Sequence, residues 1–350
     1  MRRRDLLLSA PLWTLSPGHA AVMERRALVF PRDHGAHLDE RTEWWYITGR
    51  VQAQARTFGF QLTFFRSRVD ETQGLRSSLA ARQLIFAHAA VTDVAGRQLL
   101  SADRIARAGA QADVSVNDTD LRLRDWTLLR EGTRYTARMR ASEFELALDL
   151  TQTQPMLLQG ERGWSRKGPR PEQASFYYSL PQLAVGGSVT LRGQSLSVTG
   201  GSAWLDHEWS EAFLDPDAVG WDWIGMNLAD GSALTAFRLR RKDGSTLYSG
   251  GSFRARGGTI YPASNGETEF SAQRRWRSPA SGATYPVEWL VKTPADIYTV
   301  KAVLDNQEMQ AQASSGSIYW EGLSDLYDSN GHKVGSGYLE MTGYARPLIL

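Results

Sequence analysis

Apolar side chains alternate with polar or small ones along much of this chain. The alternation is clearest in residues 51–55, 58–65 and 144–150. A period of two is typical of antiparallel strands that bury one face. Turn signals separate these stretches, and Asn-Gly and Asp-Gly pairs are the strongest of them. The turn signals are Gly74, Ala95-Gly96, Asn117-Asp118, Glu131-Gly132, Gly186-Gly187, Gly200-Gly201, Asp230-Gly231, Asp243-Gly244 and Asn330-Gly331.

Helical periodicity is rare in the sequence. Residues 76–87 form the best candidate helix, but the same residues are equally compatible with a long loop. Many short strands joined by tight turns indicate a barrel or a sandwich. We therefore predict an all-β fold.

A weak internal repeat predicts two similar domains. Residues 43–49 and 221–225 each combine aromatic residues, an apolar residue and a glycine, and each is followed by a hairpin into an Arg-containing strand. The glycine- and proline-rich segment 160–171 is predicted to be a linker or a long surface loop. We place the domain boundary near residue 185, which gives domains of residues 21–185 and 186–350.

The first 20 residues have the features of an export signal. Arginines 2–4 precede a short apolar stretch, and Gly18-His19-Ala20 places small residues before a cleavage point. The paired arginines resemble a twin-arginine signal, which predicts a periplasmic or secreted protein. The alternative is a cytoplasmic chain with a basic start. No later run reaches the roughly 20 apolar residues that span a bilayer, so at most a transient contact with a membrane surface is expected.

The composition excludes several classes of function. The chain has no cysteine, which removes disulfides, thiolate nucleophiles and zinc–thiolate sites. The net charge is only +2 and no basic block could follow a phosphate backbone, so we expect no nucleic-acid partner. A nucleotide-binding glycine loop and a serine-hydrolase elbow are also missing from the sequence. We therefore predict no cofactor.

The segment 204–210 carries the most specific candidate chemistry. It places Asp206, His207 and Glu208 between Trp204 and Trp209, in a chain with 12 tryptophans. Aromatic surroundings shift the pKa of an ionisable group, so these three residues are the predicted catalytic residues. In a regular strand Asp206 and Glu208 would share a face with Trp204, whereas His207 would point to the other face. A common site therefore requires a bulge, or a His207 that acts indirectly. A buried structural network of the same residues is the alternative.

An apolar cavity lined by aromatic rings is predicted around these residues. Hydration of an isolated alkene needs a proton donor, stabilisation of a cation and an oriented water molecule. Two histidines beside carboxylates in residues 33–40 offer a weak metal motif, which we interpret as a polar loop. No metal site is therefore predicted. The candidate substrate-binding residues are Trp204, Trp209, Trp221, Trp223, Glu43, Trp44, Trp45 and Tyr46.

Several blocks of sequence resemble the AttH-like family, which includes carotenoid 1,2-hydratases (hydroxyneurosporene synthases) and exported bacterial proteins labelled as secreted hydrolases. The blocks are residues 33–37, 43–49, 177–179, 203–209, 320–322 and 337–344. The resemblance implies two consecutive lipocalin-like antiparallel β-barrels packed together. It also adds Tyr178 to the candidate substrate-binding residues. The family contains hydratases, cyclisation catalysts and uncharacterised members, so the resemblance leaves the activity open.

Two functions follow as hypotheses. The first is a cofactor-independent hydratase-like enzyme that acts on an apolar, isoprenoid-like substrate by acid–base catalysis. The second is a non-catalytic periplasmic protein that binds a lipid-like ligand, for example as an accessory to an ABC export system. Both suit a barrel, because binding sites there are mostly apolar with a few placed polar groups. The buried ionisable groups favour the enzyme, since a lipid carrier has little use for them.

Overall fold

The alternating stretches form antiparallel strands in the computed structural model, which describes residues 23–77 and 80–348. Residues 51–53, 58–65 and 144–150 all lie in strands, as predicted. The predicted signal segment, 1–20, lies outside the described residues. Helices in the described part of the chain are the single 3-10 turns η1 (Arg32–His34) and η2 (Asp70–Thr72). Neither has the length and apolar character of a membrane-crossing helix.

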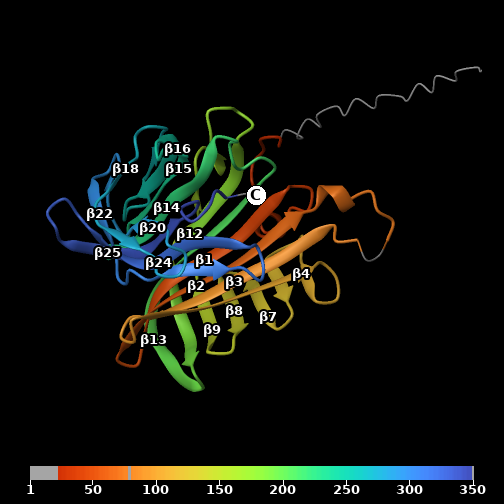
Figure 1. The fold of residues 1–350 in the computed structure, drawn as a ribbon, viewed down its shortest axis with the longest axis horizontal. Helices are drawn as coiled ribbons and strands as arrows, with labels where there is room; N and C mark the ends of the chain where they lie inside the picture. The colour runs from red at the N-terminus through yellow and green to blue at the C-terminus, as the bar shows by residue number, and fades with distance from the viewer. Residues whose placement is uncertain (1–22, 78–79, 349–350) are drawn as a thin grey trace, which may run out of the picture.

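The first and larger sheet, sheet A, has 13 strands. Its strands are β1 (Thr42–Ala53), β2 (Arg56–Arg68), β3 (Gln83–Asp93), β4 (Gln98–Arg107), β5 (Ala112–Val114), β6 (Asp120–Leu123), β7 (Trp126–Glu131), β8 (Arg134–Arg140), β9 (Phe144–Thr151), β10 (Leu157–Leu158), β11 (Trp164–Arg166), β12 (Ala174–Leu191) and β13 (Gln194–Ser210). The main order is β4-β3-β2-β1-β13-β12-β9-β8-β7-β6-β5, with β10 and β11 pairing with β12. The sheet curls until β4 approaches β6, which makes a nearly closed barrel (Figure 1).

The second sheet, sheet B, has 10 strands. Its strands are β14 (Ala218–Leu228), β15 (Ala233–Arg241), β16 (Thr246–Arg254), β17 (Ile260–Ala263), β18 (Glu269–Ala272), β21 (Glu288–Lys292), β22 (Ile297–Ala302), β23 (Glu308–Ala311), β24 (Ser317–Tyr327) and β25 (Lys333–Met341). A small separate ladder joins β19 (Arg275–Arg277) and β20 (Thr284–Pro286). The two large sheets are two lipocalin-like units packed side by side, as the sequence predicts (Figure 1).

The two sheets repeat one arrangement. In sheet A the first strand, β1, lies between β2 and the last strand, β13; in sheet B the first strand, β14, lies between β15 and the last strand, β25. Each first strand also carries a buried acid opposite an arginine. Arg66 Nε lies 2.8 Å from Glu43 Oε2, and Arg238 Nε lies 2.7 Å from Asp222 Oδ2. The repeat in residues 43–49 and 221–225 thus corresponds to equivalent strands of the two sheets.

Strands β12 and β13 are longer than the sequence indicates. The pairs Gly186-Gly187 and Gly200-Gly201, predicted as turns, lie inside these strands, so those predictions are wrong. Gly187 has a φ of +103° beside a shift in the β12–β13 register, and a Cβ there would collide with the carbonyl of Ala147. The glycine bends a long strand instead of ending it.

Other segments also differ from the prediction. Residues 83–87 of the candidate helix belong to β3, and none of the described residues around them is helical. The segment 160–171 contains β11, which pairs with β12, so it is part of sheet A and not a linker. The chain passes from sheet A to sheet B in residues 211–217, whereas residue 185 falls inside β12.

Candidate functional site between the two sheets

Strand β13 divides the predicted catalytic residues between two faces. Its pairing with β1 runs in register from Ser210 to Gly200, without a bulge in the segment 204–210. Leu205, His207 and Trp209 therefore point into the core of sheet A. Trp204, Asp206 and Glu208 point toward sheet B. Because the bulge that a common site requires is missing, His207 can act on the face of Asp206 and Glu208 only indirectly.

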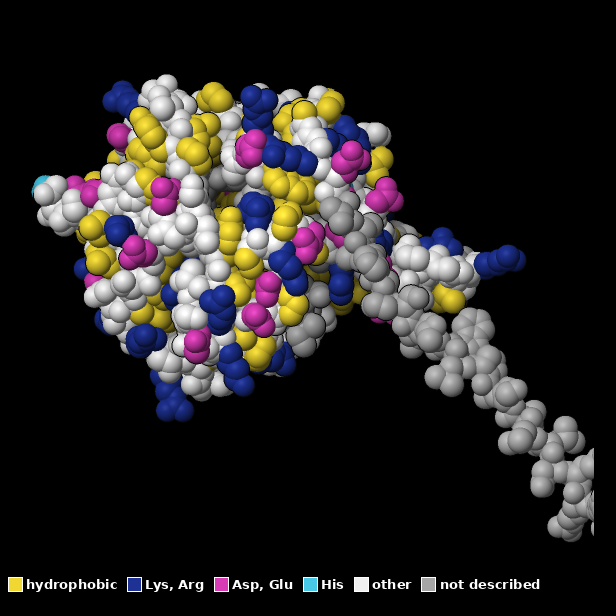
Figure 2. Space-filling model, turned by 90° about the horizontal axis from the view of Figure 1, so that it is seen from above, with side chains coloured by type: hydrophobic (Ala, Val, Ile, Leu, Met, Phe, Trp, Pro, Cys, Tyr) yellow, Lys and Arg dark blue, Asp and Glu magenta, His cyan; other side chains and the backbone are white. Residues whose placement is uncertain are grey.

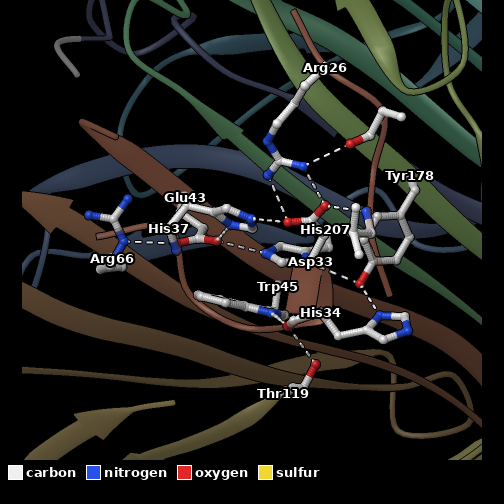
Figure 3. Close-up of polar contacts among 12 residues, drawn as sticks. Arg26, Asp33, His34, His37, Glu43, Trp45, Arg66, Thr119, Tyr178 and His207 are labelled. Carbon is white, nitrogen blue, oxygen red and sulfur yellow. Dashed lines mark hydrogen bonds and ion pairs between the residues drawn. The ribbon is translucent and has the colours of Figure 1, made fainter. Parts of the chain in front are cut away.

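The inner face of β13 carries a connected set of polar side chains, all buried except Arg26, here called the inner network (Figure 3). Its members are Arg26, Asp33, His34, His37, Glu43, Arg66, Tyr178 and His207. Glu43 Oε1 lies 2.7 Å from His37 Nδ1 and 2.9 Å from His207 Nε2. Glu43 Oε2 accepts hydrogen bonds from Arg66 Nε and from the backbone N–H of His37. Glu43 thus joins loop 32–41 to strands β1, β2 and β13.

The remaining nitrogens of the two histidines also have partners. His37 Nε2 lies 3.0 Å from Asp33 Oδ1, and Arg26 donates to both oxygens of Asp33 at 2.6 and 2.7 Å. His207 Nδ1 lies 3.1 Å from the hydroxyl of Tyr178, which is also 2.7 Å from His34 Nδ1. Each ring is therefore fixed at both ends, as expected of a network that specifies a fold.

The charges of the inner network are balanced. Burial by itself would raise the pKa of Glu43, but hydrogen bonds from His207 and His37 and the charge of Arg66 hold that pKa well below its usual value. Burial lowers the pKa of His207 to about 4, so this ring is neutral at pH 7. Burial also opposes charge on His37, but hydrogen bonds to Asp33 and Glu43 raise its pKa. The inner network therefore holds its ionised carboxylates against fixed cations.

Three members of the inner network have the atom types of a metal site. The ligand-type atoms of His37, Glu43 and His207 lie within 4.8 Å of one another. These atoms already share hydrogen bonds, and Glu43 is paired with the guanidinium of Arg66. The donor set therefore fits a proton-sharing network at least as well as a metal, since a cation would sit close to a fixed positive charge.

The opposite face of β13 contributes to a second set of buried and half-buried side chains, here called the outer cluster, between sheets A and B. It comprises Tyr46, Lys167, Tyr177, Trp204, Asp206, Glu208, Trp221, Trp223, Glu321 and Glu340. Asp206 is 3% exposed and accepts hydrogen bonds from the Tyr177 hydroxyl at 2.7 Å, from Trp204 Nε1 at 2.7 Å and from Ser179 Oγ at 2.5 Å. Burial raises the pKa of Asp206 to about 7 in spite of these three donors, so the group can give or take a proton at neutral pH.

Glu208 is the second predicted acid on this face, and it has a basic partner. Lys167 Nζ lies 2.9 Å from Glu208 Oε1, and Ser175 donates to the same oxygen. The ammonium of Lys167 also lies over the rings of Phe237 and Tyr177, at 4.3 and 4.5 Å from their centres. Burial raises the pKa of Glu208, and the charge of Lys167 opposes that rise.

Sheet B adds two acids that the sequence reasoning missed. Glu321 on β24 and Glu340 on β25 are direct cross-strand partners, which places their Cβ atoms about 5 Å apart. Glu321 is 2% exposed, and its carboxyl lies against the hydroxyls of Tyr46 and Tyr319. Burial raises the pKa of Glu321 well above its usual value, and it raises the pKa of Glu340 to about 7.

Aromatic rings close the outer cluster at one end. Phe213, in the segment that links the sheets, packs against Trp44 at 4.9 Å and against Trp221 at 5.5 Å between ring centres. Both tryptophans are only half-buried, so the cluster reaches the surface here. One face of the molecule is hollowed near its centre among hydrophobic side chains (Figure 2).

The structure divides the predicted substrate-binding residues in the same way. Those on the face between the sheets are Trp44, Tyr46, Trp204, Trp221 and Trp223. Those inside sheet A are Glu43, Trp45, Tyr178 and Trp209. The interior of sheet A is filled by core side chains, so the residues of this second group serve packing and the inner network. Glu321 and Glu340 were missed because a lone Glu in an alternating strand carries no sign of its partner across the sheet.

Known proteins share this architecture. A putative AttH from Nitrosomonas europaea has 43% identity and a TM-score of 0.86, covering 92% of this chain and 99% of that one. Kievitone hydratase from Nectria haematococca has 13% identity and a TM-score of 0.71, covering 93% and 95%. CghA bound to Sch210972 has 12% identity and a TM-score of 0.54, covering 86% and 88%.

The second and third of these similarities concern the fold alone. No curated protein sequence matches the chain. The sequence does match the AttH-like family over residues 21–344. The chain therefore belongs to the AttH-like family, as the motifs of its sequence indicate.

Proposed function

We propose that the outer cluster is the active site of a hydratase-like enzyme, which adds water to a carbon–carbon double bond of an apolar substrate. The observation that carries the proposal is Asp206, a buried acid among aromatic rings whose pKa of about 7 suits proton transfer at neutral pH. The shared fold of kievitone hydratase is compatible with this chemistry, but the proposal rests on the chemistry of the residues themselves.

The residues of the cluster suit the separate steps of hydration. Protonated Asp206 donates its proton to one carbon of the double bond, which leaves a cation on the other carbon. The ring faces of Trp204 and Trp223 stabilise that cation. A water molecule then forms the new C–O bond and gives its excess proton to a carboxylate, for which Glu208 is suited because Lys167 favours its charged form.

The experiment is an incorporation assay. The protein is incubated with apolar compounds that carry terminal isoprenoid double bonds, in water enriched in ¹⁸O, and products are analysed by mass spectrometry. The expected product is heavier by one water and carries the heavy oxygen. Absence of incorporation from every compound, including any ligand extracted from the purified protein, would contradict the hydratase proposal.

One observation favours a second function. Both oxygens of Asp206 are already engaged by donors of the chain itself, an arrangement that could simply stabilise a buried acid. On this basis the protein would bind a lipid-like ligand without changing it, as an accessory to an ABC export system for example. A ligand that is retained through purification and recovered without incorporated oxygen would favour this function. The signal-like residues 1–20 support export for either function.

A further inference from the structure

Sheet B has a cavity at the place where its two ends meet. Strands β17 and β18 are those ends, and β17 pairs only with residues 251–254 of β16. Residues 246–249, at the start of β16, therefore lie near β18 without a ladder of strand pairing to any described residue on that side. The cavity between them has a volume of about 420 Å³. Sites for small molecules have volumes of roughly 300–1,000 Å³.

Neutral polar side chains form most of the wall of this cavity. The hydroxyl and amide side chains that line it are Thr246, Ser249, Asn265, Thr268 and Ser271. Among the described residues that line it, the only charged side chain is that of Glu269, whose carboxylate lies 2.9 Å from Lys292 Nζ. Hydroxyl and amide groups both donate and accept hydrogen bonds. The wall therefore favours a neutral ligand with many hydroxyl groups over an ion.

An apolar surface completes the wall. It is formed by Leu247 of β16 and Phe270 of β18. The ring of Phe270 packs edge to face against Trp289, with 5.8 Å between the ring centres, so its position is fixed. A sugar ring has hydroxyl groups around its rim and C–H groups on its faces. A wall that combines hydroxyl groups with one aromatic ring matches both parts of such a ligand.

Thr268 gives independent evidence that the cavity takes a ligand. Its side chain is 3% exposed, yet its hydroxyl makes no hydrogen bond with the described residues. Thr268 directly precedes β18 and alternates with Glu269, so it shares the cavity side of the chain with Phe270. Buried hydroxyl groups nearly always have a partner, because burial without one lowers stability. A ligand in the cavity would supply the partner that the chain does not.

The loop that carries this wall is already held in position. The backbone N–H of Ser249 donates to Asn265 Oδ1 at 2.9 Å, and Ser249 Oγ accepts from the N–H of Gly266 at 3.1 Å. These bonds use the oxygen of the Asn265 amide and leave its nitrogen to donate to a ligand. A wall that is formed before binding loses little conformational freedom when the ligand enters.

We propose that the cavity between β16 and β18 binds a neutral sugar ring. The hydroxyl groups of the sugar exchange hydrogen bonds with Ser249, Asn265 and Thr268, and one face of its ring lies against Phe270. The cavity shares no residue with the outer cluster, so this proposal does not depend on the hydratase activity and stands or falls separately from it.

The test compares rings with and without hydroxyl groups. The methyl glycosides of glucose, galactose, mannose and N-acetylglucosamine are titrated into the full-length protein and followed by saturation-transfer NMR. Tetrahydropyran, which has the same ring without hydroxyl groups, is titrated in parallel. We expect at least one glycoside to bind at least tenfold more tightly than tetrahydropyran. Failure of all four glycosides to bind, or equal affinity for tetrahydropyran, would overturn the proposal.

Two threonine variants separate binding from stability. Thr268→Val should weaken binding of the glycoside at least tenfold, whereas the free energy of unfolding should stay the same or rise, because the hydroxyl has no partner to lose. Thr235→Val is the matched control on β15 of the same sheet. Thr235 is 1% exposed and donates to the carbonyl of Ile224 at 3.0 Å, so its loss should lower the free energy of unfolding and leave the glycoside affinity unchanged.

Urea titration of both variants accompanies the binding measurements. A Thr268 variant that binds the glycoside as tightly as the unaltered protein, or that loses as much stability as the Thr235 variant, would contradict the role given to this hydroxyl and with it the proposal. Phe270→Leu removes the aromatic face and should also weaken glycoside binding at least tenfold. It decides the matter if the Thr268 variant does not fold.

Discussion

The two faces of strand β13 bury similar side chains but balance their charges differently. On the inner face, the acids Asp33 and Glu43 have a guanidinium each, from Arg26 and Arg66, and His37 bridges them. On the outer face, Lys167 is paired with Glu208, and no ion pair within the described part of the chain involves Asp206, Glu321 or Glu340. The first arrangement stabilises the fold, whereas the second places ionisable groups where burial works against their charge.

The comparison shows where function should be sought. The folding of the chain accounts for a charge-balanced network, because each member would be costly to bury without the others. A set of buried acids with raised pKa values has no such explanation in the folding of the chain. Local stability is lowered there, and sites of chemistry or binding are the usual reason.

The largest expected effect separates catalysis from stability. Asp206→Asn should lower kcat by about 100- to 10,000-fold, because the side chain can no longer transfer a proton. The free energy of unfolding should change by no more than about 1 kcal/mol, since the amide can keep hydrogen bonds to its neighbours. Turnover is followed by heavy-oxygen incorporation and unfolding by urea titration. Wild-type turnover in the variant would show that Asp206 is not the acid.

The corresponding change on the inner face should act on stability. Glu43→Gln leaves Arg66 buried without its counter-ion and should lower the free energy of unfolding by about 3–5 kcal/mol. Glu340→Gln is the matched control, because it removes a carboxyl that has no basic partner among the described residues. Urea titration at pH 7 compares the two. A larger loss in the Glu340 variant would reverse our interpretation of the two faces.

The two faces should also give opposite dependences on pH. The pKa of Glu43 lies well below 4.5 in the folded state, so its contribution is present above pH 4.5 and is lost as the pH falls further. Glu340 has a folded pKa of about 7 against 4.5, so the folded state holds more protons between these values and stability declines as the pH rises through that window.

Unfolding measured across this range should resolve the two contributions. Glu340→Gln should flatten the decline between pH 4.5 and pH 7, and Glu43→Gln should remove part of the decline in acid. A wild-type curve that rises steadily from pH 4.5 to pH 7 would contradict the raised pKa of the outer acids.

Much of the fold could be predicted from local pattern. The period of two gave the strands, and the repeated aromatic blocks identified equivalent strands, β1 and β14, of the two sheets. The errors arose where a residue has two structural uses. Gly186-Gly187 and Gly200-Gly201 allow long strands to bend, whereas a glycine pair in sequence resembles a turn. The segment 160–171 has the composition of a linker, yet Lys167 within it is buried against Glu208.

The site was predictable only in part, for a related reason. Strand alternation correctly separated Asp206 and Glu208 from His207, because that separation needs nothing beyond the period of the strand. The partners of these residues could not be predicted. Glu43 and His207 are 164 positions apart, and Glu340 lies within electrostatic range of Asp206 only because sheet B packs on sheet A. Long-range pairing leaves no local signal in one sequence.

The smallest effect provides the sharpest comparison, because two adjacent tyrosines of β12 point to opposite faces. The hydroxyl of Tyr178 links His34 to His207, whereas that of Tyr177 donates to Asp206 and accepts from Trp223. Tyr178→Phe should cost about 1 kcal/mol of stability and leave turnover unchanged.

Tyr177→Phe removes a donor that favours ionised Asp206, so the pKa of that acid should rise and the pH profile of kcat should move to higher pH. The two variants each lose one hydroxyl oxygen, at neighbouring positions. A difference between their pH profiles therefore reports on which face of β12 the hydroxyl lies, because the chemical group removed is the same. A profile shifted equally by both would mean that the two faces are coupled through β12, and the inner network would then have to be counted as a positioning element of the site.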